Sequence, residues 1–104
     1  MAESFSEPEP NVIESTAGFS VRVLARTGLR YTEGQQSVWI DSEVLAKPGP
    51  GAIALFRDRI DIWDSLNDPV PVSDADRDRI TENVKRAFEA RGYELQVHAD
   101  FDWL

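Results

Sequence analysis

Three features are scarce in this chain: cysteine is absent, histidine occurs once, and long apolar runs are missing. Without cysteine, neither a disulfide framework nor a thiolate metal site can form. Because His98 is the only imidazole, one chain cannot build a two-histidine metal site. A membrane-spanning helix needs about 20 successive apolar residues, whereas the longest apolar run here lies within Ala52–Phe56. We therefore expect no metal, no other cofactor and no membrane association.

Negative charge is concentrated at the two ends of the chain. The net charge is −8 over 104 residues. Residues 1–17 contribute −4 and residues 99–104 contribute −2, so residues 18–98, with 13 acidic and 11 basic residues, carry only −2. This central part is nearly neutral and has no basic stripe, so we expect no binding to nucleic acid and no mimicry of it.

Length and composition predict one domain between two tails. A chain of 104 residues can bury one core without disulfides or metal. Residues 1–17 contain two prolines and no sustained periodicity, so they are expected to be a mostly disordered acidic tail, with local docking of Val12 and Ile13 as the alternative. Residues 18–98 form the domain, and residues 99–104 form an acidic, aromatic C-terminal tail. The chain start lacks the basic and apolar segments of a secretion signal, which favours a cytoplasmic location.

Hydrophobic periodicity predicts the elements of that domain. Apolar residues alternate in five segments typical of strands, near residues 19–23, 29–32, 37–41, 52–56 and 59–64. A helix is predicted over residues 74–91, beginning after Ser73 and ending at Gly92, and residues 93–98 form a last strand. A single amphipathic helix has one apolar stripe and needs one sheet face to bury it. We therefore predict an α+β fold, a mainly antiparallel sheet of about six strands with one helix in the C-terminal half packed on one face.

Strand alternation divides the predicted sheet into two faces. The face turned toward the helix holds apolar residues: Val21, Val23, Leu29, Tyr31, Val38, Ile40, Ile53, Leu55, Ile60, Ile62, Tyr93, Leu95 and Val97. The opposite face holds charges of both signs together with two tryptophans and a phenylalanine. Exposed aromatic residues within a polar surround are typical of protein interfaces. The predicted partner-binding residues are Arg30, Trp39, Asp41, Phe56, Asp61 and Trp63.

Two alternatives would use the same aromatic residues without a foreign partner. The apolar residues of the tails could fold back over them, or the face could pair two copies of the chain into a homodimer. A one-residue slip in strand register would also exchange the two faces.

Metal and catalytic motifs are rejected on spacing. Asp74, Asp76 and Asp78 have the spacing of a calcium loop, but Arg79 replaces the required glycine and Lys85 replaces the bidentate glutamate. These acids are better explained as helix N-terminal residues.

No catalytic constellation is found either. His98 could act as a general base only beside a nucleophile, and the sequence has no serine in a nucleophile elbow. Asp61 and Asp64 could pair as in a glycosidase, but nothing in so short a chain suggests a sugar cleft. We therefore predict that the protein is not an enzyme.

The segment from Leu29 to Glu43 resembles part of a family of small predicted immunity proteins from bacterial polymorphic toxin systems. Residues 53–56, the segment from Ile60 to Asp64, the helix around Arg79-Ile80, and Gly92-Tyr93-Glu94 share this resemblance, which covers about residues 19–98. The resemblance implies a non-enzymatic cytoplasmic antidote whose partner is a cognate protein toxin. It carries no known functional residues, so the candidate site comes from the face analysis alone. A homodimeric structural or adaptor domain is the alternative function.

Overall fold

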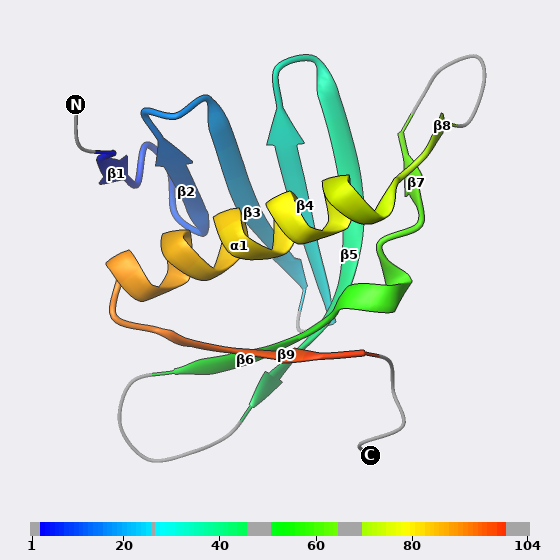
Figure 1. Ribbon diagram of the computed structural model, residues 1–104. Coiled ribbons are helices and arrows are strands. Elements are labelled where there is room, and N and C mark those ends of the chain that lie inside the picture. The colour runs from blue at the N-terminus through cyan, green and yellow to red at the C-terminus, as the bar shows by residue number, and fades with distance from the viewer. Residues whose placement is uncertain (1–2, 26, 46–50, 65–69, 100–104) are drawn as a thin grey trace.

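The computed structural model describes residues 3–25, 27–45, 51–64 and 70–99, and it shows a curled sheet that holds one helix against its inner face (Figure 1). The seven strands lie in the order β1-β2-β3-β4-β5-β6-β9. Their bounds are β1 (Phe5–Ser6), β2 (Val12–Ser15), β3 (Phe19–Ala25), β4 (Gly28–Glu33), β5 (Gln36–Leu45), β6 (Ala52–Phe56) and β9 (Glu94–His98). A 3-10 turn, η1 (Arg57–Arg59), and a small sheet of β7 (Ile62–Trp63) and β8 (Val70–Pro71) precede the helix α1 (Asp74–Ala90). The predicted α+β class is confirmed.

Sheet pairing follows the chain until α1 intervenes. Neighbouring strands from β1 to β6 are antiparallel, whereas β6 and β9 are parallel. Parallel strands need a crossover connection, and the segment containing α1 supplies it. The ten-residue β5 pairs with β4 through residues 36–41 and with β6 through residues 42–45. The chain after β6 then runs along the first half of β5, where the Asp64 N–H donates to the Ser37 carbonyl at 2.7 Å.

The helix begins and ends almost where the sequence predicts. The Ser73 hydroxyl accepts a hydrogen bond from the Asp76 N–H at 3.1 Å, which caps the first turn. Gly92 follows the helix with φ of 84°, a conformation that favours glycine at a helix end. The apolar stripe that α1 buries consists of Ile80, Val84, Ala87 and Phe88.

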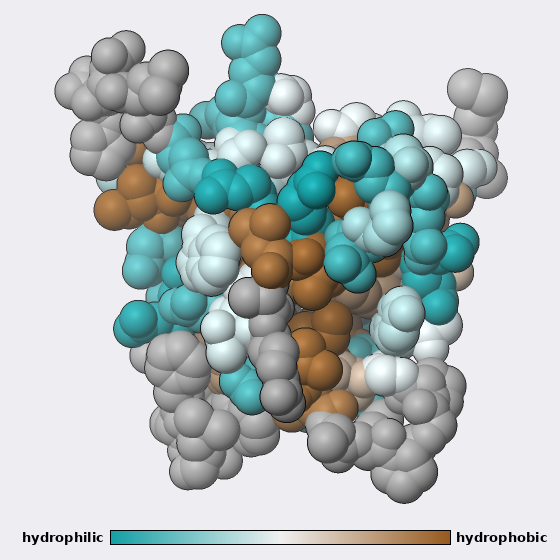
Figure 2. Space-filling model, turned by 180° about the vertical axis from the view of Figure 1, so that it is seen from behind, coloured by the Kyte–Doolittle hydropathy of each residue, from teal (hydrophilic) through white to brown (hydrophobic). Residues whose placement is uncertain are grey.

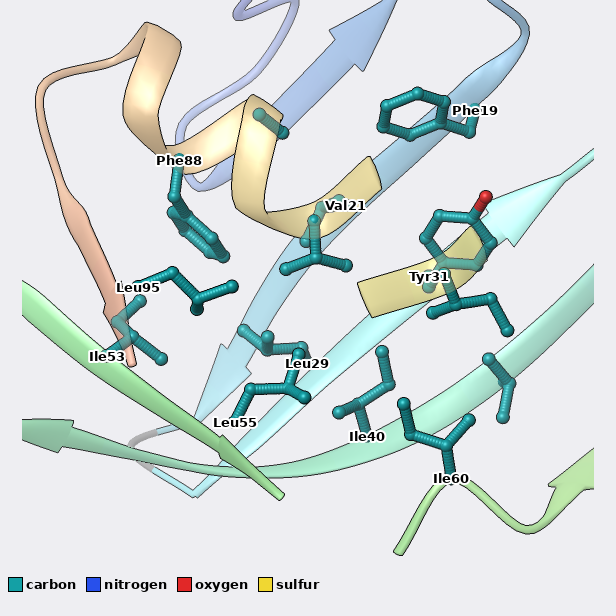
Figure 3. Close-up of a cluster of buried hydrophobic side chains, with 14 of the residues drawn as sticks. Phe19, Val21, Leu29, Tyr31, Ile40, Ile53, Leu55, Ile60, Phe88 and Leu95 are labelled. Carbon is teal, nitrogen blue, oxygen red and sulfur yellow. The ribbon is translucent and has the colours of Figure 1, made fainter. Parts of the chain in front are cut away.

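The core lies between α1 and the inner face of the sheet (Figure 3). In that view, labelled side chains of β3, β4, β5 and β6 gather between the strands and α1, together with Phe88 of α1 and Leu95 of β9. Most residues predicted to face the helix are in this core: Val21, Leu29, Tyr31, Val38, Ile40, Ile53, Leu55, Ile60 and Leu95. Val23 is partly buried against it.

Three residues predicted to face the core are exposed instead. Ile62 is 50% exposed, and Tyr93 and Val97 are each 43% exposed. Tyr93 directly precedes β9 and Val97 lies within it. Because β9 is an edge strand with a neighbour on one side only, both side chains are less covered. Ile62 is exposed because its neighbour Trp63 takes the inward position.

One buried polar contact joins α1 to the sheet. The Tyr31 hydroxyl donates to the Glu33 carboxylate at 2.9 Å and accepts from the Asn83 amide of α1 at 2.8 Å. Desolvation raises the pKa of Tyr31 well above its ordinary value. The hydroxyl therefore stays protonated. Its hydrogen bonds to Glu33 and Asn83 hold α1 over β4.

The N-terminal segment differs from its prediction as a mostly disordered tail. Within residues 3–17, two strands extend the sheet, and Val12 and Ile13 are each only 5% exposed. Their burial, together with pairing of β2 to β3, supplies the apolar contacts and backbone hydrogen bonds that the polar composition does not indicate. Of the C-terminal tail predicted at residues 99–104, only Ala99 lies within the described residues.

Candidate functional site

The face of β3, β4 and β5 turned away from α1 is the candidate surface, and we call it the outer face. Residues paired across adjacent strands point to the same side of a sheet, so the register defines its rows. Its residues are Ser20, Arg22, Gly28, Arg30, Thr32, Ser37, Trp39 and Asp41. Figure 2, which views the molecule from behind, shows hydrophobic residues gathered near the middle with hydrophilic residues around them. The outer-face residues have hydrophilic or near-neutral hydropathy, so they are not the hydrophobic residues of that view.

Trp39 is the exposed aromatic residue of the outer face. It is 39% exposed, and its indole Nε1 donates to Asp41 at 2.9 Å. The ring lies against the backbone of Gly28, where a Cβ atom would come within 2.0 Å of two ring carbons. A glycine at position 28 therefore leaves the space in which the indole lies, and Asp41 fixes its orientation.

Ion pairs flank the indole on the outer face. The second oxygen of Asp41 accepts from Arg59 Nε at 3.2 Å. Arg30, directly opposite Trp39 in the β4–β5 ladder, pairs with Asp64. These exposed pairs orient the side chains but add little stability individually.

A further ion pair lies in the same cross-strand row. Arg22 faces Arg30 across the β3–β4 ladder, and Arg22 pairs with Glu9 at 3.0 Å. Two like charges directly opposite each other are unfavourable in a sheet. Carboxylates from outside the row, Glu9 and Asp64, compensate for this repulsion.

Three of the six predicted partner-binding residues are thus brought together: Arg30, Trp39 and Asp41. Asp61 is exposed, but its carboxylate lies 4.0 Å from Arg77 of α1, outside the outer face. Partner binding by any of these residues stays a prediction.

The prediction that Trp63 is exposed on the face away from the helix is wrong. Trp63 is 2% exposed and belongs to the core. The sequence predicts a continuous strand over residues 59–64, but η1 occupies its start and interrupts the two-residue alternation, so both Ile60 and Trp63 point inward. The pKa of Asp76 is lowered by hydrogen bonds from Arg79 and, more weakly, from Trp63.

The prediction that Phe56 is exposed on that face is also wrong. Phe56 is 1% exposed, and every residue of β6 is buried. The strand lies between β5 and β9, and its continuous apolar sequence is typical of a strand covered on both faces. Its ring centroid lies 6.3 Å from that of His98 on β9.

Sequence reasoning missed Gly28, Arg59 and Asp64 as members of the site. Nothing in the sequence pattern around Gly28 indicates this role, since the approach of the indole is visible only in three dimensions. Asp64 lies 34 positions from Arg30, and Arg59 lies 18 from Asp41, so no local pattern indicates these pairs.

Within residues 3–25, 27–45, 51–64 and 70–99, no group of three or more His, Asp or Glu side chains could hold a metal ion. The only α-helix in that part of the chain, α1, is too short and too polar to cross a membrane. The described outer face offers aromatic, guanidinium and carboxylate groups, an arrangement suited to binding a protein surface.

Comparison with protein families identifies the class. A family model of immunity proteins matches residues 21–98, which include the outer-face strands β4 and β5, most of β3, and all of α1. The chain belongs to this family, described as Immunity protein 74. The resemblance found in the sequence is thereby confirmed. Neither curated proteins nor solved structures gave a match.

Proposed function

We propose that this protein binds a cognate protein toxin through its outer face and neutralises it without catalysis. Membership of an immunity-protein family supports a role in toxin immunity in general. The observation that carries the proposed surface is the half-exposed Trp39 indole, placed opposite Arg30 and held by Gly28 and Asp41.

Trp39 and Arg30 are the residue types that contribute most to binding energy in protein interfaces. Their ordering before binding reduces the entropy that association costs. The ion pairs at Arg22, Arg30 and Arg59 supply a polar surround. A partner of ordinary size would cover roughly 800 Å² on each side, so contacts would extend beyond these residues.

The proposal also covers the biological system and the cellular location. We infer that the protein belongs to a bacterial polymorphic toxin system and acts in the cytoplasm of the producing cell. Family membership supports this setting.

Co-expression with the toxin encoded beside the protein tests the proposal. Wild-type protein should rescue growth, and Trp39→Ala should lose rescue while its far-UV circular dichroism stays unchanged. Tyr93→Ala is the matched control, because Tyr93 is an aromatic residue of similar exposure, 43%, outside the outer face. Full rescue by Trp39→Ala would contradict the proposed surface.

Sedimentation separates toxin binding from self-association. A monomer that forms a complex with the toxin, lost in Trp39→Ala, is the expected result. A homodimer that dissociates on Trp39→Ala, with toxin binding unchanged, would assign the outer face to the alternative function.

A further inference from the structure

The acidic N-terminal segment, residues 3–15, is held by arginines of the rest of the molecule. Each of its first three glutamates pairs with a different arginine: Glu3 with Arg86 at 2.9 Å, Glu7 with Arg91 at 2.7 Å, and Glu9 with Arg22 at 3.0 Å. All three arginines belong to the part of the chain that the family model matches. The negative charge of the N-terminal segment is therefore matched by positive charge on the surface it covers.

Backbone pairing joins the segment to the same surface. β2 pairs antiparallel with β3, through Val12 with Arg22, Ile13 with Val21 and Glu14 with Ser20. β1 pairs in turn with β2, and Phe5 packs edge-on against Phe19 with ring centroids 6.2 Å apart. Figure 1 shows β2 beside the C-terminal half of α1. Without this segment, β3 would be the edge strand of the sheet.

The pair at Glu3 is the most elaborate of the three. Its carboxylate accepts from the Ser15 hydroxyl and from Arg86. These contacts, that of Ser15 foremost, lower the pKa of Glu3. Arg86 also donates to Asn83 at 2.6 Å, and Asn83 donates to Tyr31 at 2.8 Å. The segment is thus connected to the polar contact between α1 and the sheet.

The other two pairs are more open to solvent. Glu7 and Glu9 keep 41% and 61% of their side-chain surface exposed, and Arg91 and Arg22 keep 38% and 48%. Exposed ion pairs are individually weak and screened by salt. An edge strand presents unpaired backbone groups that another strand can pair with. The surface beneath the segment therefore has what strand addition requires, a strand side that β2 pairs with and matched charge.

We propose that the edge of β3, flanked by Arg22, Arg86 and Arg91, is a docking site for an acidic extended peptide. In this chain residues 3–15 occupy the site, and the three glutamates are what the site recognises. The partner it fits is an extended protein segment that carries carboxylates and pairs antiparallel with β3. This site shares Arg22 with the outer face, whereas Arg86 and Arg91 lie outside that face.

Charge reversal in the full-length protein tests this proposal. Glu7→Arg with Glu9→Arg places like charges against Arg91 and Arg22, so hydrogen–deuterium exchange protection should fall in β2 while α1 stays protected. Glu14→Arg is the matched control, because Glu14 is an exposed glutamate of the same segment that pairs with none of the three arginines. Unchanged β2 protection in the double variant would overturn the proposal.

Peptide binding then tests the site in trans. The probe is a synthetic peptide of residues 1–17, added to wild-type protein, the double variant and Glu14→Arg. The double variant should bind it about tenfold or more tightly than wild type does, because the tethered segment competes less. Raised salt should weaken binding, and a peptide with its first three glutamates changed to glutamine should bind more weakly than the unchanged peptide. Equal binding of both peptides would overturn charge recognition.

A charge exchange covers the case in which the double variant does not fold. Glu7→Arg alone should lower β2 protection, and adding Arg91→Glu should restore it because the ion pair is rebuilt with its charges exchanged. Failure of the added Arg91→Glu to restore protection would overturn the role of the ion pair. These experiments measure hydrogen–deuterium exchange and peptide binding, whereas the toxin surface is tested by growth rescue. Failure of this site and failure of the proposed toxin surface are therefore distinguishable.

Discussion

Substitution by alanine is expected to lower the free energy of unfolding much more at Trp63 than at Trp39. Trp63 is 2% exposed and packs in the core. At about 25 cal/mol per Å², removing roughly 150–250 Å² of buried aromatic surface gives an upper estimate of about 4–6 kcal/mol. Measured Trp→Ala changes in cores cost about 3–5 kcal/mol, which we take as the expected loss. Small domains have roughly 5–15 kcal/mol in total, so Trp63→Ala should leave the fold marginal.

Trp39→Ala should cost clearly less than Trp63→Ala, roughly 1–2 kcal/mol in free energy of unfolding, because the indole is 39% exposed and makes one exposed hydrogen bond. Urea unfolding followed by far-UV circular dichroism measures both variants without relying on tryptophan fluorescence. A cost below about 1 kcal/mol for Trp63→Ala would refute its place in the core. A cost for Trp39→Ala as large as that for Trp63→Ala would show that this indole serves the fold rather than binding.

Three further substitutions or conditions give independent checks. Tyr31→Phe removes a buried hydroxyl that bridges α1 and β4, and leaving its partners unsatisfied should cost about 1–3 kcal/mol in urea unfolding. Gly28→Ala should displace the Trp39 ring, abolish the ring-current shift of residue 28 in the NMR spectrum and weaken toxin binding, whereas retained binding with a displaced ring would contradict a role for ring position. The pKa of Glu3 is lowered in the folded protein, so its contribution to stability is present above the ordinary carboxylate pKa and lost as pH falls through the lowered value. Acid titration should therefore show a loss of stability that is absent in Glu3→Gln, and identical profiles would count against the Glu3–Arg86 pair.

The outer face shows how much of the site could be predicted. Arg30, Trp39 and Asp41 were found because β4 and β5 alternate regularly around a two-residue period. Phe56 and Trp63 were misplaced because β6 is covered on both faces and η1 interrupts the next strand. A period of two identifies a face only while the strand continues and only one of its sides is buried.

The sequence by itself determined α1, the inward residues of β3, β4 and β5, and the α+β class. These depend on local periodicity and capping, which neighbouring residues specify through helix and strand geometry. Only the tertiary structure decided that residues 12–15 join the sheet, that Trp39 lies against Gly28, and which arginine each N-terminal glutamate meets. Such contacts join residues far apart in the chain, up to 84 positions for Glu7 and Arg91, and they form only when the sheet curls around the helix.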